Sequence, residues 1–257
     1  MERFRRFWTQ RLDALGAELA RGGRERRENP AEPPSTKQRG RHMIDINQVN
    51  ATHREIGNHA LTTGEGRSLL LRRTYDAPIE DVWSACTDPD RISRWLAPIE
   101  GDLRLGGTFQ LKDNAGGEIL RCEEPHLIKV TWAFGEGMLT EVEVRLARDG
   151  DGTVLELEHS SPAEIVDELL RTYGPGGTIG VGGGWDLALL GLHLFLSDAT
   201  FDPATWEDTP EVKEFATRSC HAWGAVIQAA WGTSDDDIAA AIAFGVQHFA
   251  PETGENG

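Results

Sequence analysis

Short runs in the middle of the chain alternate apolar and polar residues with a period of two, which is the period of a β-strand. The alternation is clearest in residues 140–148 and 153–159, where apolar residues take one phase and glutamates take the other. A strand of this kind buries one face and exposes the other, so the pattern predicts an antiparallel sheet covered on one side. The runs expected as strands are residues 69–75, 101–104, 108–112, 117–122, 128–134, 140–148 and 153–159.

Residues 184–196 have the spacing of a helix that is apolar on two opposite sides. At 100° per residue, one side holds Trp185, Leu189, Leu192 and Leu196, and the other holds Leu187, Leu190 and Leu194. The sheet can cover only one of these sides. Helical spacing in residues 211–231 and 234–246 predicts a pair of helices that covers the other side, unless a dimer interface does so.

A glycine-rich segment, residues 173–184, precedes this helix. It lacks the Lys-Ser/Thr pair of a phosphate-binding loop, and we expect either a plain connector or a flexible hinge or lid. Asp186 follows it at the expected start of the helix, where a carboxylate would meet the positive end of the helix dipole.

Composition divides the chain into four regions. Residues 1–42 combine an amphipathic helical pattern with a basic linker rich in glycine and proline. Residues 43–66 form a lead-in segment, residues 67–197 carry the strands and the long helix, and residues 198–257 form a helical extension. Strands followed by helices predict an α+β fold.

Charge is distributed unevenly along the chain. Of the 26 basic and 42 acidic residues, residues 1–42 contain 11 and 6, which leaves 15 basic and 36 acidic residues in the remainder. A body this acidic repels phosphate backbones, so we expect no nucleic-acid partner. No apolar run approaches the roughly 18–20 residues of a membrane helix and no secretion signal is visible, so we expect a cytoplasmic protein with no membrane partner.

Several motifs resemble one protein superfamily. They are Tyr-Asp-Ala-Pro-Ile-Glu-Asp-Val-Trp at residues 75–83 with its continuation to Pro98, Gly-Gly-Thr-Phe at 106–109, Leu-Glu-Leu-Glu-His at 155–159, and Gly184-Trp185. The chain resembles the SRPBCC (START-like) superfamily, in its AHSA1-like branch, which is named for the activator of Hsp90 ATPase. The resemblance implies the helix-grip fold, in which a curved antiparallel sheet wraps around a long C-terminal helix, here with an added C-terminal helical pair. It also implies an internal cavity, but it does not select a reaction.

The space between the sheet and the 184–196 helix is therefore the expected ligand site. The residues expected to line it are Trp132, Phe134, Leu157, His159, Trp185, Leu189 and His193. Their aromatic and aliphatic surface favours a small apolar or aromatic ligand. We expect no metal site, because no third ligand is spaced to join the two histidines, and no cofactor.

Three classes of function stay open at this point. The sequence favours ligand binding over catalysis. An enzyme of the polyketide cyclase/aromatase type or a hydrolase-like enzyme would use His159 and His193 to transfer protons. An interaction protein, either an Hsp90-type co-chaperone or a regulator-linked stress-response protein, would instead bind a chaperone or another protein, or act as a homodimer.

Overall fold

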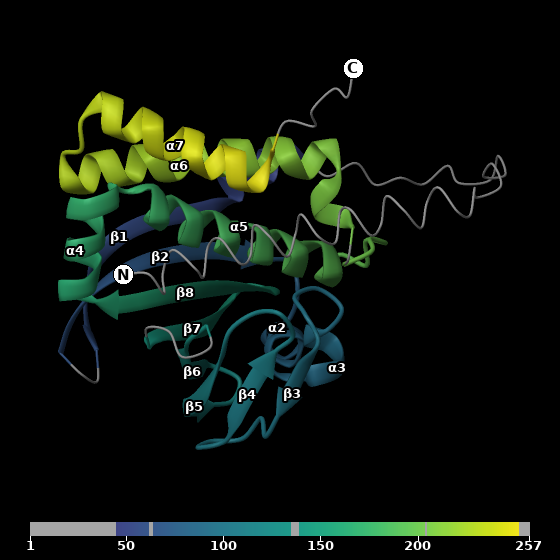
Figure 1. The fold of residues 1–257 in the computed structure, drawn as a ribbon. Helices are drawn as coiled ribbons and strands as arrows, with labels where there is room; N and C mark the ends of the chain where they lie inside the picture. Colours follow the sequence, from purple (N-terminus) through teal and green to yellow (C-terminus); the bar gives the residue numbers. More distant parts are fainter. Residues whose placement is uncertain (1–44, 62–63, 135–138, 204, 252–257) are drawn as a thin grey trace, which may run out of the picture. The chain divides into compact units, whose positions relative to one another are not determined.

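The structure is a computed structural model that describes residues 45–61, 64–134, 139–203 and 205–251 (Figure 1). The helix and linker predicted in residues 1–42 lie outside the described residues. The elements in chain order are η1 (Ile46–Ala51), β1 (Thr52–Leu61), β2 (Gly64–Tyr75), α2 (Ile79–Thr87), α3 (Pro89–Ile92), β3 (Ile99–Gly101), β4 (Thr108–Leu111), β5 (Gly116–Glu123), β6 (Leu127–Trp132), β7 (Thr140–Asp149), β8 (Gly152–Pro162), α4 (Ala163–Tyr173), α5 (Gly176–Leu196), η2 (Trp206–Asp208), α6 (Pro210–Trp231) and α7 (Asp235–Phe249).

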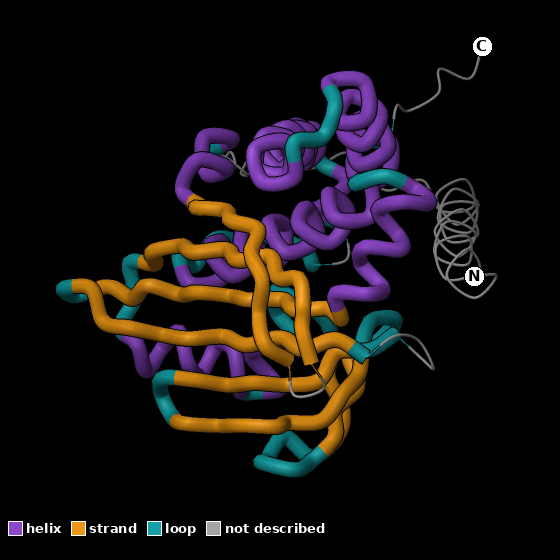
Figure 2. The backbone as a smooth tube through the Cα atoms, turned by 90° about the vertical axis from the view of Figure 1, so that its left-hand side faces the viewer, coloured by secondary structure: helices purple, strands orange, loops and turns teal. Residues whose placement is uncertain are grey.

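The strands of the described residues form one eight-stranded antiparallel sheet in the order β1-β2-β8-β7-β6-β5-β4-β3. Figure 2 shows that this sheet is bent, with α5, α6 and α7 gathered on one side of it. A register shift between Ile119 and Arg121 in β5 adds local twist, as β-bulges do. The predicted fold class, a curved antiparallel sheet closed by a long helix with an added helical pair, is confirmed.

Strand β1 is an element that the sequence analysis did not predict. It occupies ten residues of the segment expected as a lead-in and pairs along its whole length with β2, from Thr52 opposite Arg73 to Leu61 opposite Gly64. It is an edge strand with few apolar residues, so its sequence has no clear alternation. Its conformation depends on the backbone hydrogen bonds of the pairing with β2.

Helix α5 begins at Gly176, so the glycine-rich segment is helical and the expectation of a connector, hinge or lid was wrong. The reason is close helix packing. A Cβ atom added at Gly182 would overlap the indole of Trp223 in α6, and one added at Gly183 would lie 2.7 Å from the Phe249 ring of α7. The glycines lower the helix propensity but let two other helices approach the α5 backbone.

The full α5 helix is 21 residues long, and an 18-residue window within it has a mean hydropathy of 1.5, enough by length and composition to cross a membrane. The expectation that no apolar run reaches that length was therefore incomplete, because it began the helix at residue 184. In the structure 67% of the apolar window is buried inside the domain, as in the core helix of a globular fold.

The two apolar sides of α5 contact different partners, as their spacing predicts. Leu189 and Leu192 join the main core with the inner face of the sheet. Leu187, Leu190 and Leu194 join a second core whose members from other elements are Val49, Trp206, Val212, Phe215 and Ala216. Helices α6 and α7 thus form a layer over α5 (Figure 1), and α5 lies between this layer and the sheet.

Asp186 is the eleventh residue of α5, so its expected position at the helix start was wrong. Its carboxylate is fully buried and accepts two hydrogen bonds from Arg54 of β1, at 2.8 and 2.9 Å. It also accepts from the Ser219 hydroxyl at 2.5 Å and from the Trp223 indole at 2.9 Å, both on α6. One carboxylate therefore links β1, α5 and α6 through charge-assisted hydrogen bonds.

The polar face of β7 is also more buried than its alternation predicts. Glu141 and Glu143 are both less than a tenth exposed. The Lys129 ammonium on β6 lies 2.7 Å from the carboxylate of Glu141, and the guanidinium of Arg145 lies 2.7 Å from that of Glu143. These ion pairs offset part of the cost of burying the two carboxylates.

Candidate functional site

An aromatic cluster lies where the first half of α5 crosses the inner face of the sheet. The ring centroids of Trp132 on β6 and Trp185 on α5 are 5.1 Å apart, with the ring planes inclined at 48°. Phe109 on β4 lies 6.1 Å from Trp132, and the ring of His159 on β8 lies 5.9 Å from Trp185 in an edge-on arrangement. Both tryptophans are only partly buried, so the cluster combines apolar surface with access from outside.

Hydrogen bonds fix the orientation of the His159 ring. The Trp185 indole N–H, which can only donate, is 2.9 Å from Nδ1 of His159. Nδ1 is therefore the acceptor, and the ring proton sits on Nε2, which donates to the Thr140 hydroxyl at 2.8 Å. Thr140 donates in turn to the carbonyl oxygen of Trp132 at 2.7 Å. The chain of donors runs from α5 through β8 and β7 to β6.

This arrangement keeps His159 neutral and fully hydrogen-bonded. Burial lowers the pKa of the His159 imidazole to about 4, because the charged form loses its hydration in the core. With both ring nitrogens engaged, the side chain has no free lone pair with which to act as a general base. Its role in this state is to position the Trp185 ring.

His193 lies at the other end of the closing helix. It is eight residues beyond Trp185, which corresponds to roughly 12 Å along a helix axis. Its pKa is lowered first by partial burial and then by the positive charge of Arg73. The rise of the helix separates His193 from Trp185, the hydrogen-bond partner of His159, and a joint proton-transfer role of the two histidines stays a prediction.

The remaining expected site residues are divided between the core and the cluster. Leu157 and Leu189 are almost completely buried members of the main core. Leu189 lies on α5 between Trp185 and His193. Phe134 follows β6 and is partly buried. The structure thus brings together three of the seven expected residues by direct contact, namely Trp132, His159 and Trp185.

The sequence analysis missed one residue of the cluster, Phe109, and one hydrogen-bond partner of the cluster, Thr140. Phe109 shares the inward phase of its strand with Leu111, and Thr140 shares that of Val142 in β7. In both cases the alternation of apolar and polar residues along the strand indicates that the residue faces inward. The contacts across β4, β6, β7 and β8 depend on the strand order, which the alternation alone does not contain.

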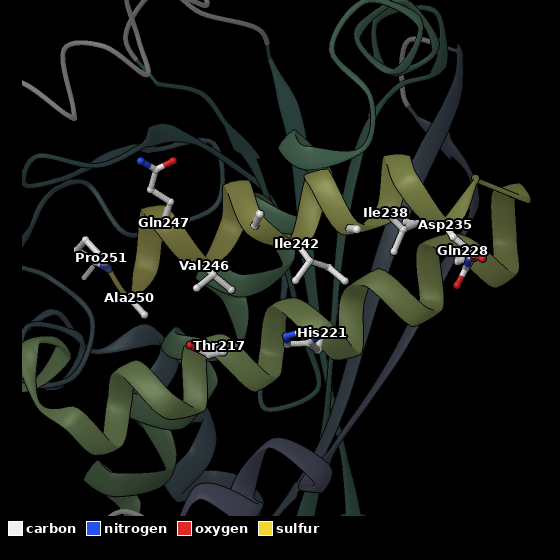
Figure 3. Close-up of a pocket in the computed structure, with 12 residues that line it drawn as sticks. Thr217, His221, Gln228, Asp235, Ile238, Ile242, Val246, Gln247, Ala250 and Pro251 are labelled. Carbon is white, nitrogen blue, oxygen red and sulfur yellow. The ribbon is translucent and has the colours of Figure 1, made fainter. Parts of the chain in front are cut away.

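A separate groove lies between α6 and α7 (Figure 3). It is open to solvent, has a volume of about 790 Å³, and contains none of the expected site residues. Its lining residues are Thr217, His221, Gln228, Asp235, Ile238, Ala239, Ile242, Ala243, Val246, Gln247, Ala250 and Pro251. Over the described parts of the chain, no three His, Cys, Asp or Glu side chains converge in a way that could hold a metal ion.

A family model and several solved structures match this chain. Residues 76–193 match the family described as activator of Hsp90 ATPase homolog 1-like protein. The chain is 40% identical to CalU16 from Micromonospora echinospora, whose crystal structure has a TM-score of 0.57 over 69% of this chain and 98% of CalU16. The solution structure of CalU16 gives a TM-score of 0.58 over 70% and 96% of the two chains. Protein MLL2253 from Mesorhizobium loti is 22% identical, with a TM-score of 0.44 over 52% of this chain and 100% of MLL2253. No curated protein matches the chain significantly.

The bent sheet, the closing helix and the aromatic cluster between them define a helix-grip domain of the SRPBCC (START-like) class. The chain belongs to the activator of Hsp90 ATPase homolog 1-like family within that class.

Proposed function

We propose that this protein binds a small apolar or aromatic molecule at the cluster formed by Phe109, Trp132, His159 and Trp185. The observation that carries the proposal is the partial burial of Trp132 and Trp185, whose rings are 5.1 Å apart and inclined to each other. Large aromatic rings that close a core are normally buried. Rings that stay partly exposed next to an apolar interior offer a surface for stacking.

The position of the cluster favours the same ligand class. Trp185 is held by His159, so its indole presents a fixed face rather than a mobile one. A preorganised ring loses little conformational entropy on binding. The neutral imidazole adds no charge, which suits an uncharged aromatic ligand.

A fluorescence titration with a panel of aromatic compounds, with native mass spectrometry to report stoichiometry, tests this proposal. A Trp185→Phe variant should bind severalfold more weakly, up to about tenfold, because it loses the larger indole ring and its hydrogen bond to His159, and a well-placed aromatic contact contributes about 0.5–1.5 kcal/mol. Trp231→Phe is the matched control, since Trp231 is also partly buried but lies at the end of α6. Equal affinity in the wild type and both variants would place the ligand elsewhere.

The family description supports a second proposal, a chaperone-directed role. Such a role predicts that the protein stimulates ATP hydrolysis by the Hsp90 homologue of its host. Steady-state ATPase assays with and without the protein measure this effect, and an unchanged rate at saturating protein would dismiss the role.

A further inference from the structure

Arg73 is a charged residue in an apolar position. Strand β2 points Leu69, Leu71 and Tyr75 into the core, and Arg73 has the same phase. Only 2% of its surface is exposed. Burial lowers the pKa of its guanidinium, although the group stays protonated because arginine titrates far above neutral pH. A positive charge is therefore held between the sheet and α5.

The donors of Arg73 are poorly matched by acceptors. Nη2 donates to the side-chain oxygen of Gln48 at 2.5 Å, and Nη1 makes a long 3.4 Å hydrogen bond to the Gln48 carbonyl. Nε is buried and has no hydrogen-bond partner. Both acceptors are neutral, whereas a buried guanidinium is normally paired with a carboxylate or phosphate.

The carboxylate of Asp186, whose charge acts on Arg73, does not supply that pairing. Both of its oxygens are occupied by Arg54, and one of them also accepts from Ser219 and Trp223. Two arginines therefore share the field of one buried carboxylate, and the group carries one uncompensated positive charge. Leaving a buried charge unpaired is costly, which indicates that another anion completes it in use.

One further polar group lies at the same point. Thr52 lies directly opposite Arg73 in the β1–β2 pairing, is 4% exposed, and has a hydroxyl with no hydrogen-bond partner. Side chains directly opposite each other on paired strands share one face of the sheet. Two neighbouring strands thus place buried, unused polar groups side by side.

We propose that Arg73 and Thr52 form a binding site for a carboxylate. A single guanidinium beside a neutral hydroxyl donor matches one negative charge in a planar group. The side-chain oxygen of Gln48 occupies the position that one carboxylate oxygen would take. Gln48 is only partly buried and lies on the short η1 segment, so its side chain can leave when an anion enters. The site is independent of the aromatic cluster and does not rest on the ligand proposed there.

The carboxylate could belong to a free small anion or to the acid group of an apolar molecule, and two probes distinguish these sources. Calorimetric titrations of the full chain at constant ionic strength use formate for the first. For the second they use phenylacetate, with uncharged 2-phenylethanol as its counterpart. Saturable formate binding supports the first source. Phenylacetate binding at least about tenfold tighter than 2-phenylethanol supports the second.

Variants assign the effect to this site. Arg73→Gln should abolish the response to both acids, whereas Arg72→Gln should keep it, because Arg72 lies on the exposed face and pairs with Glu156. Should Arg73→Gln fail to fold, Gln48→Ala provides the test. By removing the internal acceptor it should tighten carboxylate binding at least about threefold. The proposal is overturned if the wild type binds neither acid, if Arg73→Gln binds as well as wild type, or if Gln48→Ala shows no gain.

Discussion

Three buried polar residues have charges and hydrogen bonds that the apolar–polar alternation of the sequence does not predict. His159, Arg73 and Asp186 occupy positions where an apolar residue would satisfy the pattern. Each has a different state: His159 is neutral with both nitrogens bonded, Asp186 is charged and fully paired, and Arg73 is charged with an unused donor. Their effects on stability should differ accordingly.

The first prediction concerns pH. The pKa of His159 is about 4 in the folded protein and near its ordinary value of 6.5 when unfolded. The unfolded state therefore takes up the proton first, and stability falls as pH drops from about 6.5 to 4, by roughly 3 kcal/mol over that range. His159→Gln cannot titrate there. Urea unfolding at pH 7 and pH 4 should show the wild-type advantage over the variant shrinking by about that amount, whereas parallel pH curves would contradict the assignment.

The second prediction compares two bidentate Arg–Asp pairs. Asp186→Asn leaves the buried Arg54 guanidinium without its counter-charge and should lower the free energy of unfolding by about 3–5 kcal/mol. Asp167→Asn breaks the corresponding pair with Arg67, whose side chains are 32% and 43% exposed, and should cost less than about 1 kcal/mol. Chemical denaturation at pH 7 measures both, and similar losses would mean that burial does not set the strength of the Asp186 pair.

At the scale of elements, α5 shows how composition can obscure a helix. Its first half is glycine-rich because the side chains of α6 and α7 occupy the space next to its backbone. The helix forms despite low intrinsic propensity, since tertiary packing supplies what the local sequence lacks. Its glycines are not equivalent, however: some face a neighbouring helix and others face open space.

This difference gives a third prediction. Gly182→Ala places a methyl group into the Trp223 ring and should destabilise the protein by about 1–3 kcal/mol. Gly184→Ala, two residues away in the same helix, meets no atom within 4 Å and should stabilise by about 0.5–1 kcal/mol. Thermal and chemical unfolding of the pair measure the signs. If both substitutions stabilise, the glycines are not required for close packing.

The sequence predicted the elements whose signal is local. The strands with clear alternation and the two-sided leucine pattern of α5 were identified because burial follows directly from those periods. Strand β1 and the first half of α5 were missed, because their conformations depend on β2 and on Trp223. Within the candidate site, Trp132 and Trp185 were assigned correctly to one neighbourhood, whereas Phe109 and Arg73 required the strand order.

At the scale of the whole described unit, the fold has three layers, and α5 is the middle one. The sheet covers one side of α5 and the α6–α7 pair covers the other, so neither outer layer completes the core alone. The eight strands leave two edges: β3 has three residues, and β1 carries charged side chains such as Glu55. Short or charged edges disfavour pairing between sheets of different molecules.

A truncation provides the fourth prediction. Removing residues 206–257 exposes the Leu187, Leu190 and Leu194 side of α5, so the shortened chain should lose cooperative unfolding and associate or precipitate. Removing only residues 252–257, which lie beyond the last described residue, should leave the melting temperature within about 1–2 °C of wild type, because the two cores that cover α5 are built from residues before position 252. Near-ultraviolet circular dichroism and size-exclusion chromatography distinguish the two results. A monomeric, cooperatively folded truncation would show that the sheet and α5 are sufficient.

The central position of Asp186 has a consequence during synthesis, before any packing exists. As α5 leaves the ribosome it is a 21-residue apolar segment of the kind that the membrane-insertion machinery recognises. One aspartate near its midpoint opposes insertion by about 2.5–3.5 kcal/mol. The side chain that later joins the strands to the helical layer therefore also makes insertion of this segment into a bilayer less favourable.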